Sequence, residues 1–319
     1  MKLSTVVPLQ PIPHLIDYGS ELLCLGSCFA EHISRKLDHF HFKVKSNPFG
    51  ILFHPEAILN VVEKAVTDKE FTEDDIFRHN ENWHSFFSHS RLSRNSSAET
   101  LAVLNSARKQ LKEAGEKSSH IIITLGTSFI YREKSSHLGV ANCHKLSQDQ
   151  FEKELTPVDE LKIILSQLLL NFKTLHPDVK LIFTISPVRH VKDGIVENQR
   201  SKARLVSALH EVLEESSSFC FYFPSYELMV DEFRDYRFYD RDLIHPNTLA
   251  VDLIWERFKL NFISEAVYAD MDKVEKLQKS IAHRQTVSKG EAFEKLKAYQ
   301  YKLKEELIKK YPFMNFDNL

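Results

Sequence analysis

The chain has 319 residues, 43% of them hydrophobic and 27% charged, which is the composition of a folded globular protein rather than a disordered one. Its 42 Lys and Arg residues nearly balance its 44 Asp and Glu residues, so the net charge is −2 and no basic field indicates nucleic acid or an anionic membrane as a partner. No apolar run approaches the roughly 18 residues of a spanning helix, no signal-type segment opens the chain, and the 4 cysteines form no CxxC pair, so we expect a cytoplasmic protein.

The first clear pattern lies at residues 21–39. The apolar run at 22–25 predicts a short buried strand that Gly26 ends, and apolar residues at helical spacing follow from Cys28 onward. Ser27 therefore lies at a strand-to-helix turn, where backbone N–H groups lack partners. Such a turn suits a nucleophile that must stabilise an oxyanion, but a serine there is also the usual N-cap of a helix.

Short apolar strands then alternate with amphipathic helices as far as residue 265. Strands are expected at 42–44, 120–125, 181–185 and 219–223. Helices are expected from Pro55, after a cap at Ser97, from Pro157, near residue 197 and after the loop that ends at Asn247. This alternation predicts a parallel, three-layer α/β domain over residues 1–266. Residues 267–319 carry no strand signal and are rich in Lys and Glu, which predicts a helical extension, either packed on the domain or free for a partner.

The strongest chemical signal is the pair Asp242 and His245. Ligands of parallel α/β sheets bind beyond the carboxyl ends of the strands, and both this loop and Ser27 are expected there. The spacing D-x-x-H lets the carboxylate accept the Nδ1–H of the histidine, which leaves Nε2 free to take a proton from a hydroxyl. The pair could also only cap a helix. Together with Ser27 it predicts a nucleophile, a general base (His245) and an orienting acid (Asp242), with Ser27 Oγ near His245 Nε2.

The stretch GSCFA at 26–30 resembles the motif from which the GSCFA domain family takes its name. NPFG at 47–50 and TLGTS at 124–128 are also similar to that family, and the order of these blocks over residues 20–260 resembles the SGNH/GDSL esterases. The resemblance implies a flavodoxin-like, SGNH-hydrolase-like sheet with helices on both faces. It also implies hydrolysis or transfer of an acyl ester, of a saccharide or another small molecule, with no cofactor.

The chain departs from the SGNH pattern in two blocks. Gly26 precedes the serine where an aspartate is usual, and Gly126-Thr127-Ser128 stands where an asparagine usually donates to the oxyanion. The expected oxyanion donors are the N–H groups of Ser27 and Gly50 with Thr127, Asn47 or Asn142 as replacements for the asparagine. Because a lost donor costs about 3–4 kcal/mol, a ligand-binding protein with a decayed site is the alternative function, and an interaction module acting through the basic C-terminal helices is a third.

Other side chains have chemistry that could serve at this site. Cys28 is a rival nucleophile, because a thiol at a helix N-terminus has a lowered pKa, but we expect it to turn inward as a small hydrophobe. An anionic part of the substrate could be held by Arg132, Arg189 and His190, whose other interpretation is solvent-facing loop charges. Metal-ligand residue types without metal-ligand spacing occur at His84, His89, Cys143 and His144, so no metal is expected.

Overall fold

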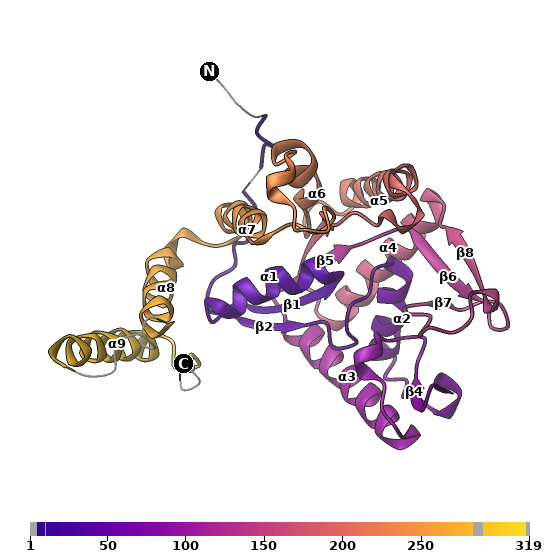
Figure 1. Cartoon of the computed structure of the whole chain (residues 1–319), viewed down its shortest axis with the longest axis horizontal. Coiled ribbons are helices and arrows are strands. Elements are labelled where there is room, and N and C mark those ends of the chain that lie inside the picture. The colour runs from indigo at the N-terminus through magenta and orange to yellow at the C-terminus, as the bar shows by residue number, and fades with distance from the viewer. Residues whose placement is uncertain (1–4, 10, 283–289, 317–319) are drawn as a thin grey trace.

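The computed structural model describes residues 5–9, 11–282 and 290–316, and its centre is a parallel β-sheet (Figure 1). The sheet has 5 strands in the order β10-β9-β5-β1-β2. In that order they are Cys220–Phe223, Lys180–Ile185, His120–Leu125, Glu21–Gly26 and Lys43–Ser46. Every neighbouring pair is parallel. Numbered by appearance in the chain, the order is 2-1-3-4-5, which is the flavodoxin-like order. The expected parallel α/β sheet is confirmed.

Helices cover both faces of this sheet, because its central strands are apolar on both sides (Figure 1). In β1, Leu23 and Leu25 join one buried cluster, whereas Leu22 and Cys24 join another on the opposite face. The first cluster is covered by α2 (Pro55–Val66), α3 (Ser97–Lys117), α4 (Val158–Leu175) and α5 (Ile195–Glu215). The second is covered by α1 (Cys28–His39) and α7 (Thr248–Phe262). The three expected layers are therefore present.

The helix starts follow the capping residues in the sequence. Pro55 is the first residue of α2, and the Oδ1 atom of Asn247 accepts the Ala250 N–H at the start of α7 at 3.0 Å. Two expected starts are wrong by one residue. Ser96 rather than Ser97 caps α3, and Pro157 is the N-cap of α4 rather than its first residue.

Two small antiparallel sheets are absent from the sequence prediction. One pairs β3 (Phe77–His79) with β4 (Asn82–His84). The other has the order β7-β6-β8, formed by Gly139–Val140, Phe129–Glu133 and Phe151–Leu155. Most residues of these strands are only partly buried, so charged residues interrupt the alternation that marks a strand. The sheet formed by β6, β7 and β8 matters below, because it forms one wall of a cavity.

The C-terminal helices α8 (Tyr268–Ala282) and α9 (Glu291–Lys310) pack on the side of the domain that carries α1 and α7. Their buried apolar residues belong to the cluster under those helices: Met271, Val274, Leu277, Leu303 and Leu307. Asp270 also accepts hydrogen bonds from Lys310 Nζ at 2.6 Å and from Tyr311 at 2.8 Å. Among the described helices, none combines the length and apolar character needed to cross a membrane.

Candidate functional site

The turn between β1 and α1 is built on Gly26. Its φ is +119°, and a Cβ atom there would lie 2.1 Å from the carbonyl oxygen of Thr124, so only glycine fits. Ser27 follows with 0% of its surface exposed. Its N–H donates to Thr124 O at 3.0 Å, and its Oγ accepts the Phe29 N–H at 3.3 Å. The hydroxyl thus acts as the N-cap of α1, and Ser27 is not among the residues that line the cavity described below.

Cys28 is the side chain of this turn that is open to a cavity. Cys28 is half-buried and lines this cavity, so its side chain is not enclosed in the core as we expected. The backbone N–H of Cys28, at the first position of α1, donates to no other described residue. Burial raises the pKa of the thiol, and the charge of Lys202 acts in the opposite direction.

Asp242 and His245 form the bonded pair that their spacing predicts. Asp242 Oδ2 lies 2.6 Å from His245 Nδ1, and Asp242 Oδ1 accepts the N–H groups of Ile244 and His245 at 2.9 and 3.0 Å. The His245 N–H, the His245 side chain and the Ile244 N–H lower the pKa of Asp242 to about 2. Both side chains of the pair are 46% exposed. Because Asp242 fixes Nδ1, the Nε2 atom is the one left for a substrate or a nucleophile.

A cavity of about 600 Å³ lies between this pair and the turn. Cys28, His245, Thr127, Arg189 and His190 all line it. Most of its wall is apolar. The apolar residues come from α2 and the segment before it, from β6, from β7 and the residue after it, and from the loops at 188–191 and 244: Phe53, Ala57, Phe129, Ile130, Val140, Ala141, Val188, Val191 and Ile244. The volume is within the range of small-molecule sites, roughly 300–1,000 Å³. Neither Ser27 nor Cys28 is hydrogen-bonded to His245, and His245 Nε2 bonds to no described residue.

The two expected backbone donors to the oxyanion are already engaged. The Ser27 N–H donates to Thr124 O, and the Gly50 N–H donates to Asn47 O at 2.8 Å. Thr127 Oγ1 lies 2.9 Å from Ser201 Oγ and accepts the Phe129 N–H at 3.0 Å. The Cys28 N–H is therefore the donor of the turn that remains open.

Asn47 and Asn142 have different surroundings. Asn47 Oδ1 accepts the Gly26 N–H at 2.8 Å, whereas its Nδ2 is buried without a partner. Asn47 thus stabilises the turn between β1 and α1 through the Gly26 N–H, and its Nδ2 remains free to donate a hydrogen bond. Asn142 lines the cavity, and its Oδ1 accepts the His144 N–H at 2.7 Å. Its amide nitrogen is the group that could face a substrate.

Of the three residues expected to bind an anion, Arg132 does not line the cavity. Its guanidinium bonds to both carboxylate oxygens of Glu56 at 2.9 Å and to Glu154 at 2.5 Å, so its charge is used within the protein. Arg189 does line the cavity; its Nη2 donates to Leu243 O at 2.6 Å and thereby fixes the Asp242–His245 loop.

His190 lies on the cavity wall with its ring edge-on to Phe53, at a centroid distance of 5.2 Å. Burial lowers its pKa to about 4, and the charge of Lys202 adds to this effect. It is therefore neutral at neutral pH, and its Nε2 is buried without a partner. A neutral imidazole does not hold an anion by charge, although it can exchange a hydrogen bond with a bound ligand.

Sequence reasoning missed Lys202, which is 1% exposed on the inner face of α5. Its Nζ donates to Gly126 O at 2.7 Å and to Ser186 O at 2.8 Å, which joins the loops after β5 and β9. Burial lowers its pKa to about 7, partly offset by Cys28 and Glu227. The sequence does carry a signal for this buried lysine. Lys202 lies seven residues before Leu209 and thus falls on the apolar face of an amphipathic helix, where a charged residue is unusual.

Three of the residues with metal-ligand chemistry, His84, His89 and His144, are hydrogen-bonded within the protein, whereas Cys143 lines the cavity. His84 Nδ1 lies 2.7 Å from Ser93 Oγ, and His144 Nε2 lies 2.7 Å from Ser85 O. The two rings are 4.7 Å apart. Within the part of the chain that the structure describes, no group of three His, Cys, Asp or Glu residues could hold a metal ion.

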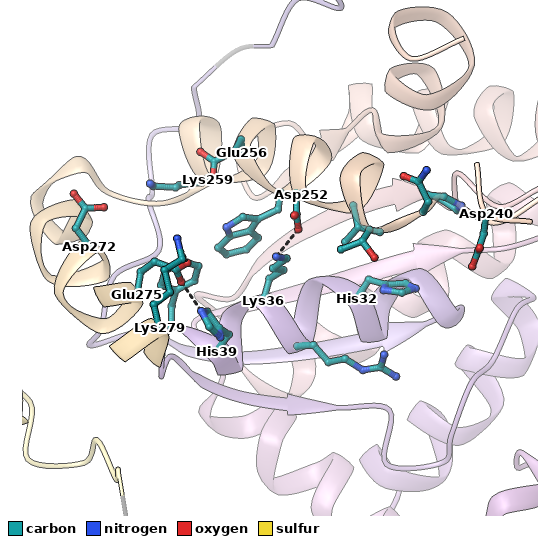
Figure 2. Close-up of a pocket in the computed structure, with 17 residues that line it drawn as sticks. His32, Lys36, His39, Asp240, Asp252, Glu256, Lys259, Asp272, Glu275 and Lys279 are labelled. Atoms are coloured by element: carbon teal, nitrogen blue, oxygen red, sulfur yellow. Dashed lines mark hydrogen bonds and ion pairs between the residues drawn. The ribbon is translucent and has the colours of Figure 1, made fainter. Parts of the chain in front are cut away.

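A second hollow, of about 780 Å³, lies between α1, α7 and α8 (Figure 2). Figure 2 shows two pairs among its polar side chains: Lys36 Nζ lies 2.6 Å from Asp252, and His39 Nε2 lies 2.6 Å from Glu275. Charges that neutralise each other leave no group of one sign for a ligand. The hollow also lacks the turn at 26–28 and His245, so we place no chemistry in it.

The model of the GSCFA family matches residues 21–258, which span β1 to α7 and include both the turn and the Asp242–His245 pair. No curated protein matches the chain.

Proposed function

The chain belongs to the GSCFA family, and on that premise we propose that it is an SGNH-type hydrolase or acyltransferase that acts on an acyl ester. The observation that carries the proposal is the Asp242–His245 pair, whose histidine lines the same cavity as Cys28, the first residue of α1. A carboxylate that holds Nδ1 fixes the tautomer in which Nε2 can accept a proton. At the start of α1, the Cys28 N–H bonds to no other described residue and can donate to a developing oxyanion.

The reaction follows from these positions. A hydroxyl or thiol of the turn loses its proton to His245 Nε2 and attacks the ester carbonyl, and the carbonyl oxygen becomes an oxyanion beside the start of α1. The C–O bond then breaks, and the leaving alcohol takes the proton from His245. Water, or an acceptor alcohol in the transferase case, releases the acyl group in the same way. Catalytic hydrogen bonds commonly tighten only with substrate bound, which fits the absence of a bond to Nε2 in the free protein.

The walls indicate the kind of acyl group. Phe53, Ile130, Val140 and their neighbours give the cavity an apolar lining, which suits an uncharged, hydrophobic acyl chain. Burial of such a chain contributes about 0.8 kcal/mol per methylene. We therefore expect longer acyl esters to bind better than acetate until the cavity is full.

The test is hydrolysis of p-nitrophenyl esters from acetate to octanoate by the whole chain and by His245→Ala. The matched control is His210→Ala, an exposed histidine on α5 that lines neither cavity. We expect hydrolysis that falls at least about 100-fold in His245→Ala and is unchanged in the control. Hydrolysis equal in all three proteins would reject His245 as the base.

One observation favours the alternative, a ligand-binding protein with a decayed site: the two expected backbone donors, the N–H groups of Ser27 and Gly50, are engaged within the protein. This function predicts binding of the ester without turnover. Saturable binding of octanoate esters, measured by calorimetry together with zero hydrolysis, would select it.

A further inference from the structure

We propose that the thiol of Cys28, not the hydroxyl of Ser27, is the nucleophile of this site. The inference rests on the proposed function, since it assigns the attacking atom of that reaction. The sequence favours Ser27 as the nucleophile. Cys28 replaces it here because of where the fold places the two side chains, the base and the oxyanion donor.

The first reason is access. An attacking atom must come within about 3–3.5 Å of the ester carbonyl. Ser27 is 0% exposed, and its Oγ already accepts the Phe29 N–H. To reach a substrate, it would have to leave the cap position and displace the packing at Gly26. Cys28 is half-buried and lines the cavity, so its sulfur can meet a substrate without any such change.

The second reason is the base. Cys28 and His245 line the same cavity, whereas Ser27 does not line it. Burial raises the pKa of the Cys28 thiol, against the opposing effects of Lys202 and of the N–H groups at the start of α1. The resting thiol therefore keeps its proton and needs a general base to become a thiolate. His245 Nε2, free of hydrogen bonds to the described residues, is placed to be that base.

The third reason is the oxyanion. When a side chain at the first position of a helix attacks a carbonyl, its own backbone N–H is the donor nearest to the new oxyanion. The Cys28 N–H is open, whereas the Ser27 N–H is bonded to Thr124 O. In other acyl-transfer sites, removal of one oxyanion donor lowers kcat about 10²–10³-fold.

The chemical step balances without a further reactant. The thiol proton moves to His245 Nε2, the sulfur bonds to the acyl carbon, and the alcohol leaves with the proton from His245. The product is a thioester on Cys28. Water then attacks the thioester while His245 takes its proton, the C–S bond breaks, and the sulfur regains the proton as the free acid leaves.

Substitution at the two neighbouring positions tests the assignment. Cys28→Ala should lower p-nitrophenyl octanoate hydrolysis at least about 1,000-fold. Ser27→Ala, which removes only a helix cap, should lower it less than about tenfold while reducing stability by the loss of the cap. Circular dichroism and urea unfolding show that each variant is folded, and Cys28→Ser, which keeps a small polar side chain, serves if Cys28→Ala does not fold. The opposite ranking of the two variants would overturn the assignment and leave the proposed function standing.

A second readout does not need turnover. In a Cys143→Ala background, which removes the other partly exposed cysteine, iodoacetamide should alkylate Cys28, because Cys24 and Cys220 are buried. Adding His245→Ala should slow this alkylation at least about threefold, since the base is lost. If no ester is hydrolysed, the proposed function fails, and this measurement still decides the role of the thiol. Alkylation that is absent or equally fast without His245 overturns the assignment.

Discussion

Lys202 makes the stability of this protein depend on pH in a way that can be calculated. Its ammonium group is buried at the carboxyl ends of β5 and β9, and burial lowers its pKa from 10.5 to about 7. In the unfolded chain the lysine keeps its proton up to its ordinary pKa. Between about pH 7 and pH 10 the unfolded state therefore binds more protons than the folded state, and the free energy of unfolding rises with pH.

The rise can be isolated with Lys202→Met, which removes the titrating group and keeps much of its length. Between pH 7 and pH 10 the free energy of unfolding of the natural protein should increase by about 3–4 kcal/mol relative to Lys202→Met. The two carbonyl acceptors of Nζ favour the charged form, so this figure is an upper bound. Other titrating groups are common to both proteins and cancel in the difference.

The assay is urea unfolding followed by circular dichroism at several pH values between 7 and 10. Lys109→Met, on the exposed face of α3, controls for the loss of one lysine. A difference between natural protein and Lys202→Met that stays level, or falls as the pH rises, would refute the reasoning. It would mean that Lys202 keeps its charge in the folded state.

Three further predictions concern the site and its supports. Gly26→Ala should destabilise the fold by about 3 kcal/mol or more, because the new Cβ would meet Thr124 O at 2.1 Å in a backbone conformation that favours glycine; urea unfolding measures it. Arg132→Ala should cost about 2–4 kcal/mol of stability, since Glu56 and its acidic neighbours lose their shared partner, and should leave the ester KM unchanged in steady-state kinetics. Asp242→Asn should lower kcat about 10²–10⁴-fold with an unchanged melting temperature. Because the pKa of Asp242 is held at about 2, the ester hydrolysis proposed for the natural protein should not fall through protonation of Asp242 between pH 4 and pH 7, which a pH–rate profile would reveal.

The parts of this structure that follow from local patterns could be predicted. Apolar runs at 22–25 and 120–125 are buried strands, and D-x-x-H closes into a bonded pair because its partners lie within one turn of chain. The parallel sheet follows from the alternation of strands and helices. These features depend on neighbours in sequence, so the sequence is enough to find them.

The features that could not be predicted from the sequence depend on contacts between distant segments. Whether Ser27 or Cys28 faces the cavity is decided by how closely Gly26 approaches Thr124, which is about 100 residues away in the chain. The engaged oxyanion donors and the buried ammonium of Lys202 are likewise set by partners on other strands. The sheet of β6, β7 and β8, which walls the cavity, was missed because its half-exposed strands lack a clear period.

Acylation of the turn is the most direct test of the central claim, that His245 activates a nucleophile at the start of α1. The full chain and His245→Ala are treated with a β-lactone, which opens on attack and leaves the acyl group on the nucleophile, and the adduct is located by mass spectrometry of the peptides. If His245 activates Cys28, we expect one adduct per chain, located on Cys28. This adduct should form at least about tenfold more slowly in His245→Ala. No adduct at the turn, or one that forms equally fast without His245, would contradict it.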